Sequence, residues 1–108
     1  MARLTLNVTI DRPIGYDHEG TIYPINYGYV AGVMGGDGEG QDAYVLTAGD
    51  QPLETFTGQL IAVVHRADDV ETKWVVTDFG KSYTADDIMT RIAFMEQYFE
   101  STLELVEE

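Results

Sequence analysis

The chain of 108 residues carries 19 Asp and Glu against 6 Lys and Arg, which gives a formal net charge of −13 at pH 7. This charge excludes nucleic acid as a partner, because six cations could neutralise only a few backbone phosphates. Its length fits one domain over residues 1–108, and 44% apolar residues, together with the aromatic content, are enough to build a core. No cysteine is present, which excludes disulfides and thiolate chemistry. The two histidines are too few for a histidine-rich zinc site, so a metal ion would have to be held by oxygen.

Alternation of apolar and polar residues predicts strands in the first part of the chain. The first strand runs over 4–11 with a period of two. Residues 12–20 contain Pro and Gly among polar residues and predict a loop. A second strand, 23–30, has one aromatic face. Gly28 within it indicates a bulge or the close approach of another backbone.

Three further segments predict a small β-structure. A glycine-rich acidic loop over 35–40 precedes a short strand at 43–46. The continuous apolar run at 60–64 predicts a strand that is buried on both faces, and 71–77 is its expected hairpin partner.

The last segment changes to a helical period. Thr84 is a suitable N-cap, and Tyr83 is placed to pack on Ile88. Steps of three and four predict one apolar helix stripe through Ile88, Ile92, Met95, Phe99, Leu103 and Val106. Glu96, Glu100 and Glu104 recur every four residues, and this stripe is expected to be a solvated face of the helix. We therefore expect a mainly β (β+α) fold, an open Greek-key barrel with one C-terminal α-helix.

Two acidic clusters are the candidate chemical features of the chain. The first occupies 37–42, where glycines let the backbone bend around a common point, and the second lies on the hairpin that ends in Lys73. Clustered carboxylates bind hard divalent cations such as Mg²⁺, although a loop of this composition also fits a plain turn. The carboxylates of the two clusters are Asp37, Glu39, Asp42, Asp68, Asp69 and Glu71.

Two motifs in this order resemble the soluble family I inorganic pyrophosphatases. YPINYGYV at 23–30, followed by DGEGQDAYVL at 37–46, is similar to the family's YPxNYGY strand and its Asp-x-Asp-x-x-Asp loop. Residues 60–66 and the turn at 68–73 resemble the second acidic loop with its acid-x-Lys ending. The resemblance implies an open five-stranded OB-like barrel with one C-terminal helix. It also implies Mg²⁺-dependent hydrolysis of pyrophosphate to two phosphates by a water activated between two metal ions, with Mn²⁺ as an alternative.

The resemblance also implies residue roles. Asp42 would bridge two ions, Glu39 stands at the position of the general base, and either Asp68 or Asp69 would complete a metal shell with Asp37 and Glu71. The expected metal ligands are thus Asp37, Glu39, Asp42, Asp68, Asp69 and Glu71. Lys73 would neutralise charge on the leaving phosphate, and phosphate oxygens would also be contacted by Tyr27 and Tyr98.

The chain departs from the family in its cations. No counterpart exists for the upstream phosphate-binding Lys and Arg, and Phe99 stands where the family has a helix Lys, so Arg12 and Arg66 are the candidate substitutes. This scarcity favours two alternatives: a catalytically weak or inactive metal- or phosphate-binding protein on the same fold, or a hydrolase of another phosphoanhydride. With no apolar run of about 18 residues, we expect a cytoplasmic protein with a small phosphate-containing substrate and no membrane partner. The resemblance leaves a homo-oligomer open.

Overall fold

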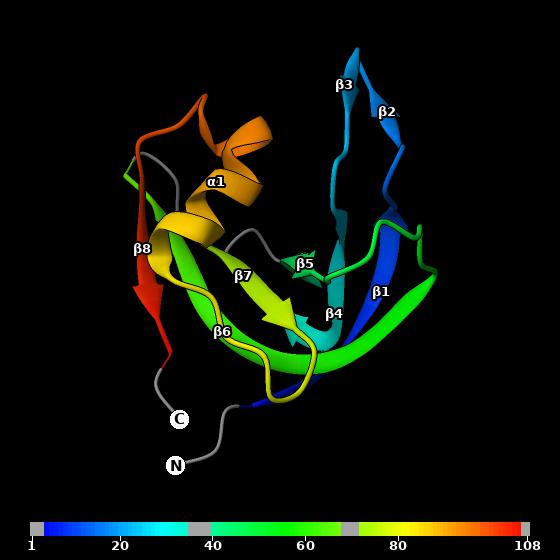
Figure 1. Cartoon of the computed structure of the whole chain (residues 1–108), viewed down its shortest axis with the longest axis vertical. Coiled ribbons are helices and arrows are strands. Elements are labelled where there is room, and N and C mark those ends of the chain that lie inside the picture. Colours follow the sequence, from blue (N-terminus) through cyan, green and yellow to red (C-terminus); the bar gives the residue numbers. More distant parts are fainter. Residues whose placement is uncertain (1–3, 35–39, 68–71, 107–108) are drawn as a thin grey trace.

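The structure is a computed structural model that describes residues 4–34, 40–67 and 72–106 (Figure 1). These residues form eight strands and one helix. In chain order they are β1 (Thr5–Arg12), β2 (Asp17–His18), β3 (Thr21–Ile22), β4 (Asn26–Met34), β5 (Gly40–Leu46), β6 (Thr55–Arg66), β7 (Thr72–Thr77), α1 (Ala85–Glu96) and β8 (Ser101–Leu105).

Five strands close into a ring in the order β1, β4, β5, β7 and β6, and β6 returns to β1. Strand β6 is long enough to pair with β1 through its first half, and with β7 and β8 through its second half. Strands β5 and β7 run parallel, so their first residues, Gly40 and Thr72, lie at the same end of the ring. The expected mainly β, OB-like barrel with one C-terminal α-helix is confirmed.

Two glycines allow the strands of this ring to approach closely. A Cβ on Gly28 would lie 1.9 Å from the carbonyl oxygen of Thr9 on β1, and one on Gly58 would lie 2.2 Å from that of Thr77 on β7. Any larger residue would push the paired strands apart. The prediction that Gly28 marks the close approach of another backbone is therefore confirmed.

Apolar residues form one cluster inside the ring and a second cluster beneath the helix. Alternation along β5 supplies both, since Ala43 and Val45 belong to the first cluster and Tyr44 and Leu46 to the second. The first is Leu6, Val8, Ile10, Val30, Ala43, Val45, Leu60 and Val76. The second is Ile25, Tyr44, Leu46, Ile61, Ala62, Val64, Val75, Ile88 and Ile92. Figure 1 shows α1 lying across β6 and β7, where it covers one side of the ring.

The helix begins as predicted and ends earlier than predicted. The hydroxyl of Thr84 accepts a hydrogen bond from the backbone amide of Asp87 over 3.1 Å, as an N-cap does. The expectation of a helical stripe through Val106 is wrong, because α1 ends at Glu96 and Leu103 lies on β8. The edge of β6 offers backbone partners to this segment, and Leu103 pairs there with Val64.

The predicted strand positions hold with shifted ends. The expected loop at 12–20 contains half of a small hairpin, in which β2 pairs with β3. Strand β4 begins at Asn26 rather than at residue 23, and β6 begins at Thr55 rather than at residue 60. None of the described residues forms a helix of the length and apolarity that a bilayer crossing needs.

Candidate functional site

Asp42 and Lys73 meet at the end of the ring where β5 and β7 begin. The next residues along the two parallel strands, Ala43 and Trp74, are register partners, so Asp42 and Lys73 are neighbours. Lys73 Nζ donates a hydrogen bond to Asp42 Oδ2 over 2.5 Å. The Lys73 side chain is 8% exposed and that of Asp42 is 28% exposed, so the lysine is enclosed while the carboxylate still reaches solvent.

Tyr27 joins this pair from the neighbouring strand β4. Its ring lies 5.1 Å from that of Tyr44, its register partner on β5. Burial raises the pKa of the Tyr27 phenol far above its usual value, and the charge of Asp42 and the Tyr27–Asp42 hydrogen bond raise it further. Tyr27 is therefore a neutral donor toward Asp42.

A second cation, Arg12, stands on the other side of Tyr27. It ends β1 and pairs with Tyr27 across the β1–β4 ladder. Its Nη1 donates to the hydroxyl of Tyr23 over 2.7 Å. Its guanidinium carbon lies 5.8 Å from the ring centres of Tyr23 and Tyr27 and 6.0 Å from that of Tyr16. Three tyrosines thus hold this guanidinium in place.

A cavity of about 300 Å³ opens beside these residues and is lined by Asp11, Tyr29, Gly40 and Asp42. Sequence reasoning missed Asp11, which lies where the β1–β4 register shifts between Ile10 and Arg12. No motif marks that shift. The only signal was a carboxylate at the expected end of the first strand. Asp11 and Asp42 bring two carboxylates to one cavity, the oxygen donors that hard cations prefer.

The remaining predicted site residues do not join Asp42 and Lys73 in the part of the chain that the structure describes. Asp37, Glu39, Asp68, Asp69 and Glu71 lie outside the described residues. Within residues 4–34, 40–67 and 72–106, no group of three or more His, Asp or Glu side chains is arranged to hold a metal ion. Tyr98 follows the end of α1 instead of lying on the helix, and it is 69% exposed.

Solved structures of inorganic pyrophosphatases share this arrangement of strands and helix. The enzyme from Ehrlichia chaffeensis aligns with 94% of this chain and 86% of its own at a TM-score of 0.70 and 17% identity. The Coxiella burnetii structure aligns with 97% of this chain and 85% of its own at a TM-score of 0.68 and 16% identity. The Helicobacter pylori structure aligns with 98% of this chain and 86% of its own at a TM-score of 0.64 and 16% identity. No protein-family model and no curated protein sequence matches the chain. The chain has the inorganic pyrophosphatase fold.

On this pyrophosphatase-like fold, Arg66 has a structural role. Its Nε and Nη2 donate to Glu96 Oε1 and Oε2 over 3.1 and 2.6 Å. Glu96 also accepts from the Tyr44 hydroxyl at 2.5 Å and from the Ser101 hydroxyl at 2.7 Å. The guanidinium carbon of Arg66 lies 3.7 Å from the ring centre of Phe99. This network joins β5, β6, α1 and the start of β8.

The expectation that Glu96 belongs to a solvated helix face is wrong, since Glu96 is 3% exposed. Burial alone would raise the pKa of its carboxyl. Hydrogen bonds from Arg66, Ser101 and Tyr44, together with the charge of Arg66, outweigh burial and lower that pKa below its usual value. Arg66 is thus paired with a buried carboxylate. Arg12 is therefore the stronger candidate to replace the phosphate-binding cations for which this chain has no counterpart.

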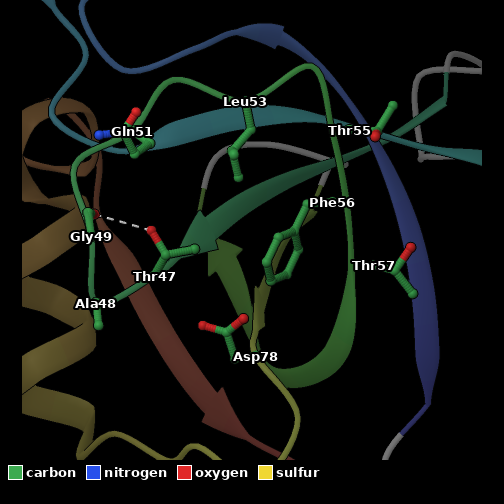
Figure 2. Close-up of a pocket in the computed structure, with 9 residues that line it drawn as sticks. All are labelled: Thr47, Ala48, Gly49, Gln51, Leu53, Thr55, Phe56, Thr57 and Asp78. Atoms are coloured by element: carbon green, nitrogen blue, oxygen red, sulfur yellow. Dashed lines mark hydrogen bonds between the residues drawn. The ribbon is translucent and has the colours of Figure 1, made fainter.

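A second cavity, of about 390 Å³, lies at the opposite end of β5 and β7 and is shown in Figure 2. Thr47, Phe56 and Asp78 project into the space that it encloses. It is lined by Thr47, Ala48, Gly49, Gln51, Leu53, Thr55, Phe56, Thr57 and Asp78. These lining residues include one carboxylate, whereas two carboxylates line the cavity beside Asp42 and Lys73 is hydrogen bonded to one of them. The cavity beside Asp42 is therefore the candidate active site of this pyrophosphatase-like chain.

Proposed function

We propose that the chain hydrolyses inorganic pyrophosphate to two phosphates in the presence of Mg²⁺. The observation that carries the proposal is the Lys73–Asp42 hydrogen bond beside a cavity of the pyrophosphatase fold, with Tyr27 and Arg12 next to it. These side chains follow one another in the order Lys73, Asp42, Tyr27 and Arg12, so that a carboxylate and a neutral phenol lie between two cations. Such an alternation suits a metal-bound polyanion, because the carboxylate attracts the metal ion and the cations attract phosphate oxygens.

Two Mg²⁺ ions would be held by Asp42, with Asp11 on the same cavity wall, and by carboxylates of the two acidic segments predicted from the sequence: Asp37, Glu39, Glu71 and either Asp68 or Asp69. When bound, such an ion would lower the pKa of a coordinated water and neutralise phosphate charge. The oxygen-only donor set fits Mg²⁺, and Mn²⁺ as the alternative, better than a softer metal.

The chain's own residues supply the rest of the proposed chemistry. Lys73 is oriented by Asp42 and would place its ammonium against charge that develops on the leaving phosphate. Arg12 would hold the other phosphate through its planar fork of donors. Tyr27, kept neutral by burial, would fix Asp42 by donating to it.

The test is phosphate release from pyrophosphate with Mg²⁺ by the wild-type chain and by two variants. Asp42→Asn removes the charge at the candidate site, and Asp78→Asn removes a carboxylate of similar size at the opposite cavity. We expect release that Asp42→Asn abolishes and Asp78→Asn preserves. The proposal is refuted if the wild-type chain releases no more phosphate than the Asp42→Asn variant.

The scarcity of cations favours a second candidate function, binding without efficient turnover or hydrolysis of another phosphoanhydride. Arg12 and Lys73 are the cations that the described residues bring next to Asp42 and Tyr27. Titration calorimetry with Mg²⁺ and then pyrophosphate distinguishes a binding protein, which shows heat of binding and no phosphate release. A panel of phosphoanhydrides distinguishes the other hydrolase, for which pyrophosphate is not the best substrate.

A further inference from the structure

The β2–β3 hairpin presents two partly exposed rings beside the candidate site. Tyr16 is 38% exposed, and the side chain of His18, two residues on, is exposed to the same extent. Their rings are nearly parallel, with an angle of 18° between the planes and 6.5 Å between centroids. The pyrophosphate proposed above has no ring, so it offers neither of these rings a stacking partner.

The hairpin holds Tyr16 in a fixed position. Its backbone amide donates to the Pro13 carbonyl, and its carbonyl accepts from the Tyr23 amide, both over 2.9 Å. After Tyr16, the Gly20 amide donates to Asp17 Oδ1 over 2.9 Å and closes the turn between β2 and β3. The rings of Tyr16 and Tyr23 pack edge to face, with 5.8 Å between their centroids. A ring held in this way loses little further entropy when a ligand stacks on it.

Tyr16 is connected to the candidate site through Arg12. The Arg12 guanidinium lies 6.0 Å from the Tyr16 ring and 5.8 Å from the Tyr27 ring, and Tyr27 is hydrogen bonded to Asp42. A ligand whose phosphate binds Arg12 therefore meets a guanidinium that also borders the Tyr16 ring. Aromatic side chains and Arg planes are the groups on which nucleobases stack.

We propose that Tyr16 and His18 bind the base of a nucleotide, so that the substrate class of this site is nucleoside diphosphates and related nucleotide anhydrides. Base stacking adds affinity that two cations alone do not supply to a bare pyrophosphate. This inference rests on the proposed function for its chemical step. In that step, water oxygen bonds to the terminal phosphorus, the bond from this phosphorus to the bridging oxygen breaks, and phosphate, nucleoside monophosphate and a proton are released.

Calorimetry with two analogues that cannot be hydrolysed at the bridge tests the inference without requiring turnover. The probes are methylenediphosphonate and adenosine 5′-(α,β-methylene)diphosphate, each added to the full chain with Mg²⁺. We expect the adenosine analogue to bind about tenfold more tightly or better. Tyr16→Phe keeps the ring and should keep this difference. Tyr16→Ala should remove it, because the adenosine analogue loses its stacking partner, whereas methylenediphosphonate loses only the support that Tyr16 gives to Arg12. Ile22→Ala changes another exposed side chain of the hairpin and should alter neither affinity.

Three results would overturn the inference. Equal affinity of the wild-type chain for both analogues would show that the rings bind no base, and would leave the proposed function intact. An equal loss of both affinities in Tyr16→Ala would show that Tyr16 only supports Arg12. Failure of both analogues to bind at millimolar concentration would overturn the anion site itself and, with it, the proposed function.

Discussion

Lys73 on β7 donates a hydrogen bond to Asp42 on β5 over 2.5 Å, although 31 positions separate the two residues in the chain. They meet because β5 and β7 run parallel and start at the same end of the ring. The carboxylate fixes the direction of the ammonium before a substrate arrives. Such preorganised charge is worth most where charge develops during a reaction.

Replacing Lys73 with Met should therefore impair turnover more than folding. Met keeps most of the side chain's volume and removes its charge, while Asp42 retains Tyr27 as a donor and some access to solvent. We expect kcat/KM for pyrophosphate to fall about 100-fold. Lys73→Arg, which keeps the charge, should retain more of the activity. Full activity of Lys73→Met in a steady-state assay would show that Lys73 does not act on the substrate.

Removing Arg66 should destabilise the fold. The side chains of Arg66 and Glu96 are 8% and 1% exposed, so Arg66→Met leaves a buried carboxylate without its counter-charge. Breaking a buried pair in this way costs about 3–5 kcal/mol of unfolding free energy. Urea denaturation at pH 7 measures the change. The double variant Arg66→Met with Glu96→Leu should regain part of the loss, since it leaves no buried charge, and a further loss would contradict this account.

Glu96 should also make the stability of the chain depend on pH. Its pKa in the folded state lies below its usual value of 4.5, so the unfolded chain binds its proton more readily. The stabilisation is therefore present above about pH 4.5 and is lost as pH falls through the lower folded-state pKa. Glu96→Gln, which cannot ionise, should be about 2 kcal/mol less stable than wild type at pH 7. In urea titrations from pH 7 to pH 3 that gap should narrow, and a constant gap would exclude Glu96 as its source.

Motifs and local patterns predict those parts of the molecule that depend on neighbours in the sequence. Thr84 was identified as the cap of α1 because its bonds reach only three residues ahead. The family resemblance joins two distant loops and names Asp42 and Lys73, and the structure brings these two side chains into hydrogen-bond contact. The alternating strands followed from their period of two, and their closure into a ring agrees with the expected barrel.

Other features depend on partners that no local pattern reveals. Glu96 lies at helical spacing from Glu100, which indicated a solvated face, but its partner Arg66 is 30 positions away. Leu103 stands four residues after Phe99, which fits a helix, and the segment becomes a strand because the edge of β6 accepts it. Asp11 reaches the cavity at a register shift in the β1–β4 pairing, which has no sequence signal of its own.

Gly28 connects the fold to the site, because it precedes the strand residue Tyr29 and follows Tyr27. Alanine there would bring its Cβ within 1.9 Å of the Thr9 carbonyl oxygen, a backbone atom that cannot rotate away. Strands β1 and β4 would have to separate, and overpacking of this kind costs about 3 kcal/mol or more. Because Arg12 pairs with Tyr27 across the same ladder, the separation should also weaken pyrophosphate binding.

Gly49→Ala is the matched control for this prediction. The described residues leave its Cβ position open, with nothing within 4 Å, so the same added methyl group should change stability by less than about 0.5 kcal/mol. Thermal unfolding of the two variants gives the stability difference, and calorimetry with pyrophosphate and Mg²⁺ gives the effect on binding. A Gly28→Ala chain as stable as Gly49→Ala would mean that β1 and β4 can separate at little cost. Normal pyrophosphate binding by a destabilised Gly28→Ala chain would show instead that the site does not depend on the pairing of Arg12 with Tyr27.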